Sequence, residues 1–180
     1  AASSSSVKLV KLAATLLLGM LAAACATTPP TPPGDALGGR LALRVEAHEG
    51  APSRSFAAPF ELRGDAATGQ FSLLSPLGTT AARADWHPGQ ATLHNDQGRS
   101  VYPDLDSLAA DMLGQALPMA ALLDWLRARP WRGAPHTTTE AGFEQLGWQI
   151  DTRERSQGRI EARRSAPPAV TVRVRLDSPG

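Results

Sequence analysis

The sequence predicts a mainly β (α+β) domain in which an antiparallel sheet curls into a barrel or half-barrel. Short runs that alternate apolar and polar residues recur at even spacing over residues 41–102 and again over 143–176. Such runs, separated by short turns, are typical of antiparallel strands. Between them, over residues 104–130, apolar residues recur at helical spacing. Two short helices in this position do not build a parallel sheet, but they can cover the open mouth of a curved antiparallel one.

The first series of strands begins where Leu41, Leu43 and Val45 alternate with polar or small residues, which predicts a strand with one apolar face. In the next run Pro59 marks an edge or a bulge, because proline has no N–H to donate to a neighbouring strand. Turns rich in glycine, proline and asparagine separate the later strands. The further strands expected in this series span residues 56–62, 71–74, 79–86, 91–94 and 99–102.

The middle of the chain predicts two short helices. Asp104 is a suitable N-cap for the first, whose apolar residues recur at helical spacing as far as Gly114. The second helix starts at Leu117-Pro118 and is stopped by Pro130, which cannot continue a helix. Its apolar stripe comprises Ala121, Leu122, Trp125 and Leu126.

The second series of strands follows a loop after the helices. Strands are expected over residues 143–151, 160–164 and 170–176, with Pro167-Pro168 interrupting the pairing of the last two. No internal repeat and no second domain is evident. Residues 37–180 are therefore predicted to form a single domain.

The first residues of the chain predict a signal peptide over residues 1–24. Lys8 and Lys11 form a basic segment, and the apolar run over residues 12–26 follows it. That run is short for a membrane span, which needs about 20 residues, but it is typical of the apolar part of a signal peptide. The expected cleavage site lies just before the only cysteine of the chain, Cys25.

Cys25 is predicted to carry a lipid anchor. The residues before it resemble a bacterial lipobox, in which the cysteine is acylated and becomes the mature N-terminus, although Ala22 stands where leucine is usual. The alternative is an incidental or buried cysteine after an ordinary signal peptide. Ala26 follows in place of the aspartate that tends to retain such lipoproteins in the inner membrane, so the resemblance implies the outer membrane. Residues 25–36 would then form an acylated cysteine and a proline-rich tether.

The composition excludes several classes of function. The chain has 18 Lys+Arg and 17 Asp+Glu, so a nucleic-acid partner, which would favour a basic face, is not expected. A single cysteine excludes an intrachain disulfide framework and a cysteine-based zinc site. The sequence holds no GxSxG motif, no Walker loop and no metal-binding spacing among its four histidines. We therefore expect no enzyme activity, no catalytic residues, no metal and no cofactor.

Two further features of the sequence concern the expected surface. The arginines over residues 153–164 could attract anionic headgroups, but they are interleaved with acidic residues, which favours a solvated strand face. Between two expected strands, Pro76 and Gly78 place Leu77 at the tip of a turn. A leucine in that position either folds back against the rim of the sheet or meets an apolar partner.

These residues resemble the LolB family of outer-membrane lipoproteins, which receive other lipoproteins and insert them into the membrane. The resemblance covers about residues 39–176. Its most specific parts are Pro76-Leu77-Gly78, the helix start at Leu117-Pro118, Trp125-Leu126 before Pro130, and Gly147-Trp148. It implies an unclosed antiparallel β-barrel with short helices forming a lid over an apolar cavity.

The resemblance also implies partners and site residues. The cavity would bind the acyl chains of a lipoprotein cargo handed over by the periplasmic carrier LolA, and Leu77 would be the membrane-insertion element. The protein would be a monomer anchored through its lipid at the periplasmic face of the outer membrane. The residues expected to line the cavity are Leu43, Phe60, Phe71, Leu73, Trp86, Trp125, Trp148 and Val172.

Two other functions stay open at this point. A half-barrel of the same type could carry a free lipid or glycolipid instead of a lipoprotein. Alternatively, the chain could be a scaffold lipoprotein of an envelope complex, with a filled core and no cavity.

Overall fold

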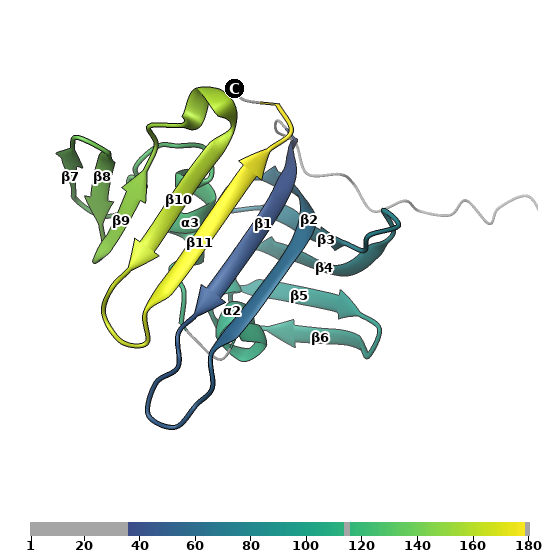
Figure 1. Ribbon diagram of the computed structural model, residues 1–180. Helices are drawn as coiled ribbons and strands as arrows, with labels where there is room; N and C mark the ends of the chain where they lie inside the picture. The colour runs from purple at the N-terminus through teal and green to yellow at the C-terminus, as the bar shows by residue number, and fades with distance from the viewer. Residues whose placement is uncertain (1–35, 114–115, 179–180) are drawn as a thin grey trace, which may run out of the picture. The chain divides into compact units, whose positions relative to one another are not determined.

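The structure, a computed structural model, describes residues 36–113 and 116–178. In this part of the chain, eleven antiparallel strands form one sheet that two short α-helices accompany (Figure 1). The predicted mainly β fold is confirmed. The elements are β1 Leu37–Val45, β2 Arg54–Gly64, β3 Gly69–Leu74, β4 Thr80–His87, β5 Gln90–Asn95, β6 Gly98–Tyr102, α2 Leu105–Leu113, α3 Met119–Trp125, β7 His136–Thr139, β8 Gly142–Gln145, β9 Trp148–Asp151, the 3₁₀ turn η2 Arg155–Gln157, β10 Arg159–Arg164 and β11 Val170–Leu176.

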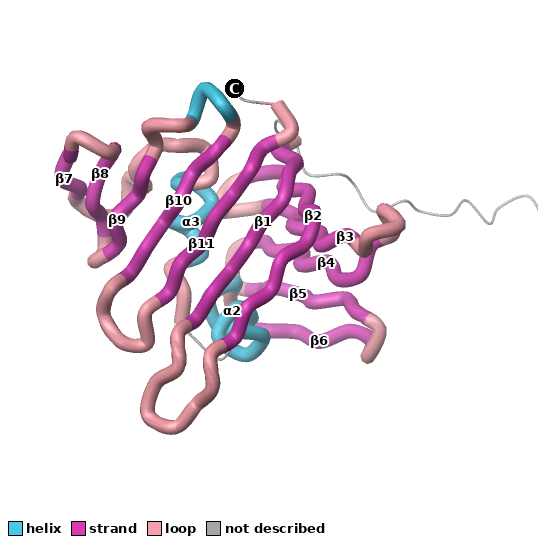
Figure 2. The backbone as a smooth tube through the Cα atoms, in the orientation of Figure 1, coloured by secondary structure: helices cyan, strands magenta, loops and turns pink. Residues whose placement is uncertain are grey.

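The order of the strands explains how two separate series build one sheet. That order is β6-β5-β4-β3-β2-β1-β11-β10-β9-β8-β7, so the first and last strands of the domain are neighbours at its centre. β1 and β11 pair from Gly39 opposite Leu176 to Val45 opposite Val170. In the described part of the chain, β6 and β7 are the two edges of the sheet, which is therefore unclosed. Figure 2 shows α2 and α3 on one side of this curved sheet.

The two faces of the central strands differ in chemistry. In β11 the buried residues Val170, Val172 and Val174 alternate with the outward-facing Thr171 and Arg173. Each branched aliphatic side chain that leaves water in this way contributes about 1.5–3 kcal/mol. The inner face therefore belongs to the apolar core, and the outer face carries arginine.

The strands of the second series differ from the prediction in two places. The predicted strand over residues 143–151 is in fact the hairpin of β8 and β9, which turns at Leu146 (φ 52°) and Gly147 (φ 75°). Positive φ at both central residues is the geometry of a tight hairpin turn, and Leu-Gly lacks the usual asparagine or aspartate signal. In addition, His136–Thr139 forms the edge strand β7, where a loop was expected.

The helices agree with the prediction except at one end. Ser107 N donates to the Asp104 carboxylate (2.7 Å), as expected of an N-cap of α2. The second helix, α3, ends at Trp125, well before Pro130. Ala128 there adopts a φ of 54°, which is incompatible with further helix, so the chain leaves the helix before the proline is reached. Met119 N donates to Asp106 Oδ1 (3.0 Å) and thereby connects the two helices.

The cap of α2 makes stability sensitive to acid. Hydrogen bonds from the Ser107 hydroxyl and backbone N–H hold the pKa of Asp104 below its ordinary value of 3.8. A lowered pKa in the folded state means that this contribution is present above the unfolded pKa and is lost as the pH falls through the folded pKa. Asp104→Asn keeps the acceptor oxygen but does not titrate. The free energy of unfolding, measured with urea, should therefore differ less between neutral and strongly acidic solution in Asp104→Asn than in the unaltered protein. The same difference in both proteins would contradict this role of Asp104.

The described residues share one sheet and one apolar core. All eleven strands pair with one another, and one apolar cluster connects the inner face of the sheet to both helices. Because the sheet and this cluster lie within residues 36–178, we expect a fragment of residues 36–180 to fold without the segment that precedes it.

Candidate functional site

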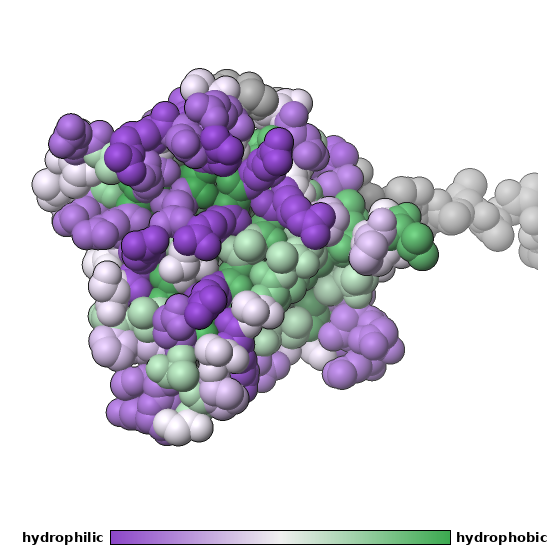
Figure 3. Space-filling model, in the orientation of Figure 1, coloured by the Kyte–Doolittle hydropathy of each residue, from purple (hydrophilic) through white to green (hydrophobic). Residues whose placement is uncertain are grey.

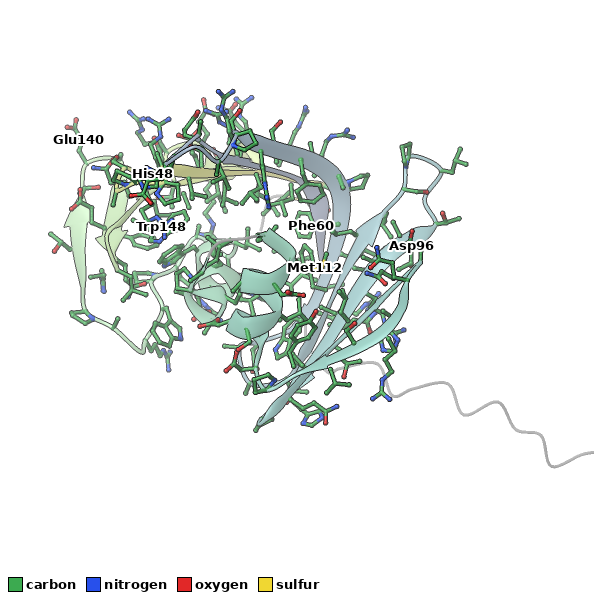
Figure 4. The ribbon with its side chains drawn as sticks, turned by 90° about the horizontal axis from the view of Figure 1, so that it is seen from below. His48, Phe60, Asp96, Met112, Glu140 and Trp148 are labelled. Carbon is green, nitrogen blue, oxygen red and sulfur yellow. The ribbon has the colours of Figure 1, made fainter. Side chains whose placement is uncertain are left out.

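An apolar pocket of about 150 Å³ lies between the inner face of the sheet and the two helices. Its walls come from β1 to β5 and β11 on one side and from α2, α3 and the residues that flank α3 on the other. Figure 4 looks into this region from below, with Phe60 on the side of the sheet and Met112 on the side of the helices. Arg83 is the charged residue among 21 lining residues, so the pocket suits an apolar ligand.

Five of the eight residues predicted to line a cavity lie around this pocket: Leu43, Phe71, Leu73, Trp86 and Val172. The sheet brings them together because alternate residues of a strand share one face. Whether they bind acyl chains stays a prediction.

The other three predicted residues lie outside this lining. Phe60 is almost fully buried and stacks on Phe71 with 5.6 Å between ring centroids. Trp125 and Trp148 contact each other at 5.6 Å in a separate part of the core. In Figure 4, Trp148 lies well away from Phe60 and Met112. Because these large rings fill the core, substituting them with smaller residues would first of all lower the stability of the protein.

A lid of helices over the cavity was predicted, but the helical residue predicted to line it, Trp125, does not, and those that do were not named. The helical side of the pocket comes mainly from leucines and methionines spaced three or four residues apart, which form one face of a helix. That spacing was used to predict the helices, and it could also have identified their contribution to the pocket. The helical lining consists of Leu105, Leu108, Ala109, Met112, Leu113, Met119, Leu122 and Leu123.

Small side chains keep the pocket open. Ala82 and Ala84 on β4 and Ala109 on α2 all line it, and none of them fills the space between sheet and helices. The pocket is partly open to solvent, and its apolar lining suits apolar ligands. The alanines therefore retain a binding volume that larger side chains would remove.

The side-chain amide of Gln145 is buried and connects Trp125 of α3 to the loop that follows this helix. Gln145 Oε1 accepts from Trp125 Nε1 (2.8 Å) and Trp131 N (2.9 Å). Its Nε2 donates to the carbonyl oxygens of Trp131 and Ala134, at 2.7 Å each. The amide thus has four partners in a site that is 98% shielded, since Gln145 is only 2% exposed. Sequence analysis did not single out this residue.

Removing this amide is expected to destabilise the protein. Gln145→Leu leaves two N–H groups and two carbonyls without their partner, and each buried unpaired group costs about 1–3 kcal/mol. Allowing for partial hydration of the loop, we expect a loss of about 3 kcal/mol in urea denaturation. Gln149→Leu is the matched control, because Gln149 is exposed and bonds only to Glu144. Equal losses in the two variants would contradict the role given to Gln145.

The turn between β3 and β4 presents Leu77 to solvent. Gly78 N donates to Ser75 O (2.9 Å), Ser75 N donates to Thr79 O (2.8 Å), and Gly78 adopts a φ of 80°. These bonds hold a tight turn in which Leu77 is 91% exposed. The alternative in which it folds back against the sheet is therefore wrong. Figure 3 shows a strongly hydrophobic tip at the right of the described residues, where Figure 1 places this turn.

The pocket and the tip belong to one continuous segment. Leu73 lines the pocket from the end of β3, and Leu77 follows only four residues later. The pairing of β3 with β4 shifts at Leu73 and Leu74, which lets the chain bend away from the sheet there.

No other feature of the described residues suggests catalysis or metal binding. Within this part of the chain, no three histidine, cysteine or carboxylate residues are grouped so as to hold a metal ion. His94 lies 3.6 Å from the Asp85 carboxylate, is partly exposed, and is not one of the residues that line the apolar pocket. Cys25, the signal peptide and most of the tether lie outside the described residues.

None of the helices in the described part of the chain is both long enough and apolar enough to span a membrane.

The unclosed sheet, its covering helices and the apolar pocket define a half-barrel of the class that can shield an apolar ligand from water. The family model described as "Outer membrane lipoprotein LolB" matches residues 36–177. The chain belongs to the LolB family of outer-membrane lipoproteins, which serves in lipoprotein localisation.

Several curated relatives are similar along most of the chain, and each is named outer-membrane lipoprotein LolB. The protein of Bordetella petrii is 32% identical over 176 aligned residues, which cover 88% of each chain. That of Ralstonia nicotianae is 32% identical and covers 90% of this chain and 94% of its own. That of Cupriavidus pinatubonensis is 34% identical and covers 76% and 73%, respectively.

Proposed function

We propose that this protein accepts acylated lipoproteins from the periplasmic carrier LolA and inserts them into the outer membrane. The observation that carries the proposal is an apolar pocket, lined by Leu73, on the same segment as the exposed tip leucine, Leu77, four residues later. Family membership and the names of the relatives support it. In this account Cys25 carries the lipid anchor, residues 25–36 form the tether, and residues 37–180 form the binding domain, which acts as a monomer.

The pocket would shield the acyl chains of the cargo. Each methylene exposed to water costs about 0.8 kcal/mol, so a lipoprotein with several acyl chains needs continuous cover between membranes. Leu43, Phe71, Leu73, Trp86 and Val172 would contact those chains from the side of the sheet. Because the sequence holds no Walker loop, transfer would follow a gradient of affinity from carrier to receptor to bilayer.

Cargo would have to widen the pocket. A volume of about 150 Å³ accommodates a ligand the size of benzene, which is less than one long acyl chain. α2 is the element best suited to move, because only Leu108 and Ala109 of this helix are fully buried, whereas α3 buries four residues. Met112 of α2 lines the pocket and is also 44% exposed. We therefore expect α2 to shift outward when chains enter.

The tip would act at the membrane. Because Leu77 is exposed, it can enter hydrocarbon without giving up contacts in the core or disturbing the fold. Burying its side chain there would gain about 1.5–3 kcal/mol. Since Leu77 follows Leu73 of the pocket wall by only four residues, its insertion would bring this wall of the pocket close to the bilayer.

The direct test is transfer of a labelled lipoprotein from purified LolA to this protein and then into vesicles. We expect the label to move from carrier to receptor and to become protected in the vesicles. Delivery of free lipid without the lipoprotein would indicate the lipid-carrier alternative. Absence of any transfer would contradict the proposal and favour a scaffold.

A further inference from the structure

Three arginines lie in one line across the outer face of the sheet. In the pairing of β1, β11 and β10, Arg40 lies opposite Arg175, and Arg175 lies opposite Arg159 on its other side. All three side chains are exposed. Like charges directly opposite one another on adjacent strands destabilise a sheet, so such a line favours an anionic ligand. We call these three residues the arginine row.

Two members of the row have no acidic partner among the described residues. Arg159 pairs with Glu154 (2.6 Å), but no carboxylate lies within ion-pair distance of Arg40 or Arg175. The other arginines that β1, β10 and β11 carry on this face are paired: Arg44 with Glu46, and Arg163 and Arg173 both with Glu161. Arg153, which also borders this region, pairs with Asp151. On this face of these three strands the arginines without an acidic partner are therefore Arg40 and Arg175.

The row borders an open hollow of about 820 Å³ on the outer face. Five arginines and three carboxylates line it, which leaves an excess of two positive charges. Arginine suits phosphate groups, because its planar guanidinium can donate two parallel hydrogen bonds to them.

An apolar strip joins the row to the tip. Pro59 of β2 lies opposite Arg40, and Ala57 lies opposite Ala42 beside it. Figure 3 shows this pale green area extending across the face toward the hydrophobic tip. The backbone of Phe60, the residue after Pro59, pairs with Leu73 at the end of β3, so this part of β2 lies beside the strand that leads to the tip; the side chains of Phe60 and Leu73 face the inner side. In Figure 4, where the outer face of the central strands is uppermost, the β3–β4 turn rises on the same side.

We propose that the arginine row and this strip form a docking surface for an anionic phospholipid bilayer, with Arg40 and Arg175 binding lipid phosphates. The proposal rests on the membrane contact of Leu77 given under the proposed function. Once the tip enters the bilayer, small apolar residues let the outer face approach the lipid, and the arginines reach the level of the headgroups. An acidic protein could match the charge alone, but the exposed tip on the same side favours a membrane.

The test is sedimentation of the fragment of residues 36–180 with vesicles of phosphatidylcholine, with and without one third of phosphatidylglycerol. We expect phosphatidylglycerol to strengthen binding and high salt to reverse the effect. Arg40→Gln/Arg175→Gln should weaken binding to the anionic vesicles about 30-fold, since each basic residue at such a surface contributes about 1 kcal/mol. Circular dichroism checks that each variant is folded.

The matched control is Arg44→Gln/Arg163→Gln, which removes the same charge from the same face but from arginines that are already paired. It should weaken binding less than about 3-fold. The proposal would be overturned if both double variants lost the same affinity for anionic vesicles. It would also be overturned if the affinity did not depend on phosphatidylglycerol. A row variant that binds vesicles normally but no longer accepts cargo from LolA would overturn it as well, and would indicate a protein-docking face. Because the assay contains neither carrier nor cargo, a failure of lipoprotein delivery would count against the proposed function and not against this surface.

Discussion

Leu77→Glu is expected to block insertion of lipoproteins into the membrane while leaving the receptor folded and able to accept cargo. Leu77 is 91% exposed and the turn is held by its own backbone hydrogen bonds, so glutamate at the tip does not disturb the core. Losing the burial of one leucine in hydrocarbon costs about 2 kcal/mol, which alone slows insertion about 30-fold. A carboxylate at the same place adds to this loss. The measurement is the rate at which labelled cargo becomes protected in vesicles.

The control for this change is Val101→Glu. Val101 is also exposed, at 56%, but it lies on the edge strand β6 and not at the tip. It tests whether any apolar-to-acidic change on the surface impairs insertion. If Leu77→Glu inserts cargo at the normal rate, Leu77 is not the membrane-insertion element.

Ala82→Phe is expected to abolish acceptance of cargo by filling the pocket. Ala82 lies on β4 opposite Leu73, half-buried at the pocket wall, so a phenyl group there would project into the cavity. A pocket of about 150 Å³ that contains an added ring has no room for an acyl chain. We expect cargo binding to fall at least tenfold, while stability changes by less than about 1.5 kcal/mol, because the ring occupies empty space. Acceptance is measured as cargo transferred from LolA, and stability as the urea midpoint.

The neighbouring residue provides the matched control. Ala81 is exposed and faces away from the pocket, so Ala81→Phe adds the same ring to the same strand on the other face. It should accept cargo normally. If Ala82→Phe also does so, the acyl chains are held elsewhere.

Much of the fold was predictable, because burial on one face of a strand imposes a period of two. The alternation in β1, β2 and β11 predicted those strands and the side that each buries. The pairing of β1 with β11 joins residues more than a hundred positions apart, so no local sequence pattern predicts it. β7 was missed because its four residues, three of them threonines, are mostly exposed and show no apolar alternation. The turn at Leu146-Gly147 was missed because leucine is not a usual residue at positive φ.

The site was predictable in part. Leu77 was singled out because Pro76 and Gly78 determine a tight turn, which depends only on local geometry. The lining of the pocket depends on which positions are small. The predicted aromatic residues included three that do not line it: Phe60 stacks on Phe71 of the lining, and Trp125 and Trp148 contact each other. A void arises where alanines of a strand and a helix meet across the domain, and a single sequence does not show which residues will face each other.

The central claim is that the pocket between the sheet and the helices holds the acyl chains of the cargo. It is tested most directly with a lipoprotein cargo whose acyl chain carries a photoreactive group, transferred to the receptor and cross-linked before insertion. The account predicts adducts on pocket residues from both walls, such as Leu73 on the sheet and Met112 on α2. Adducts confined to the outer face of the sheet, or none on the receptor after transfer, would contradict it.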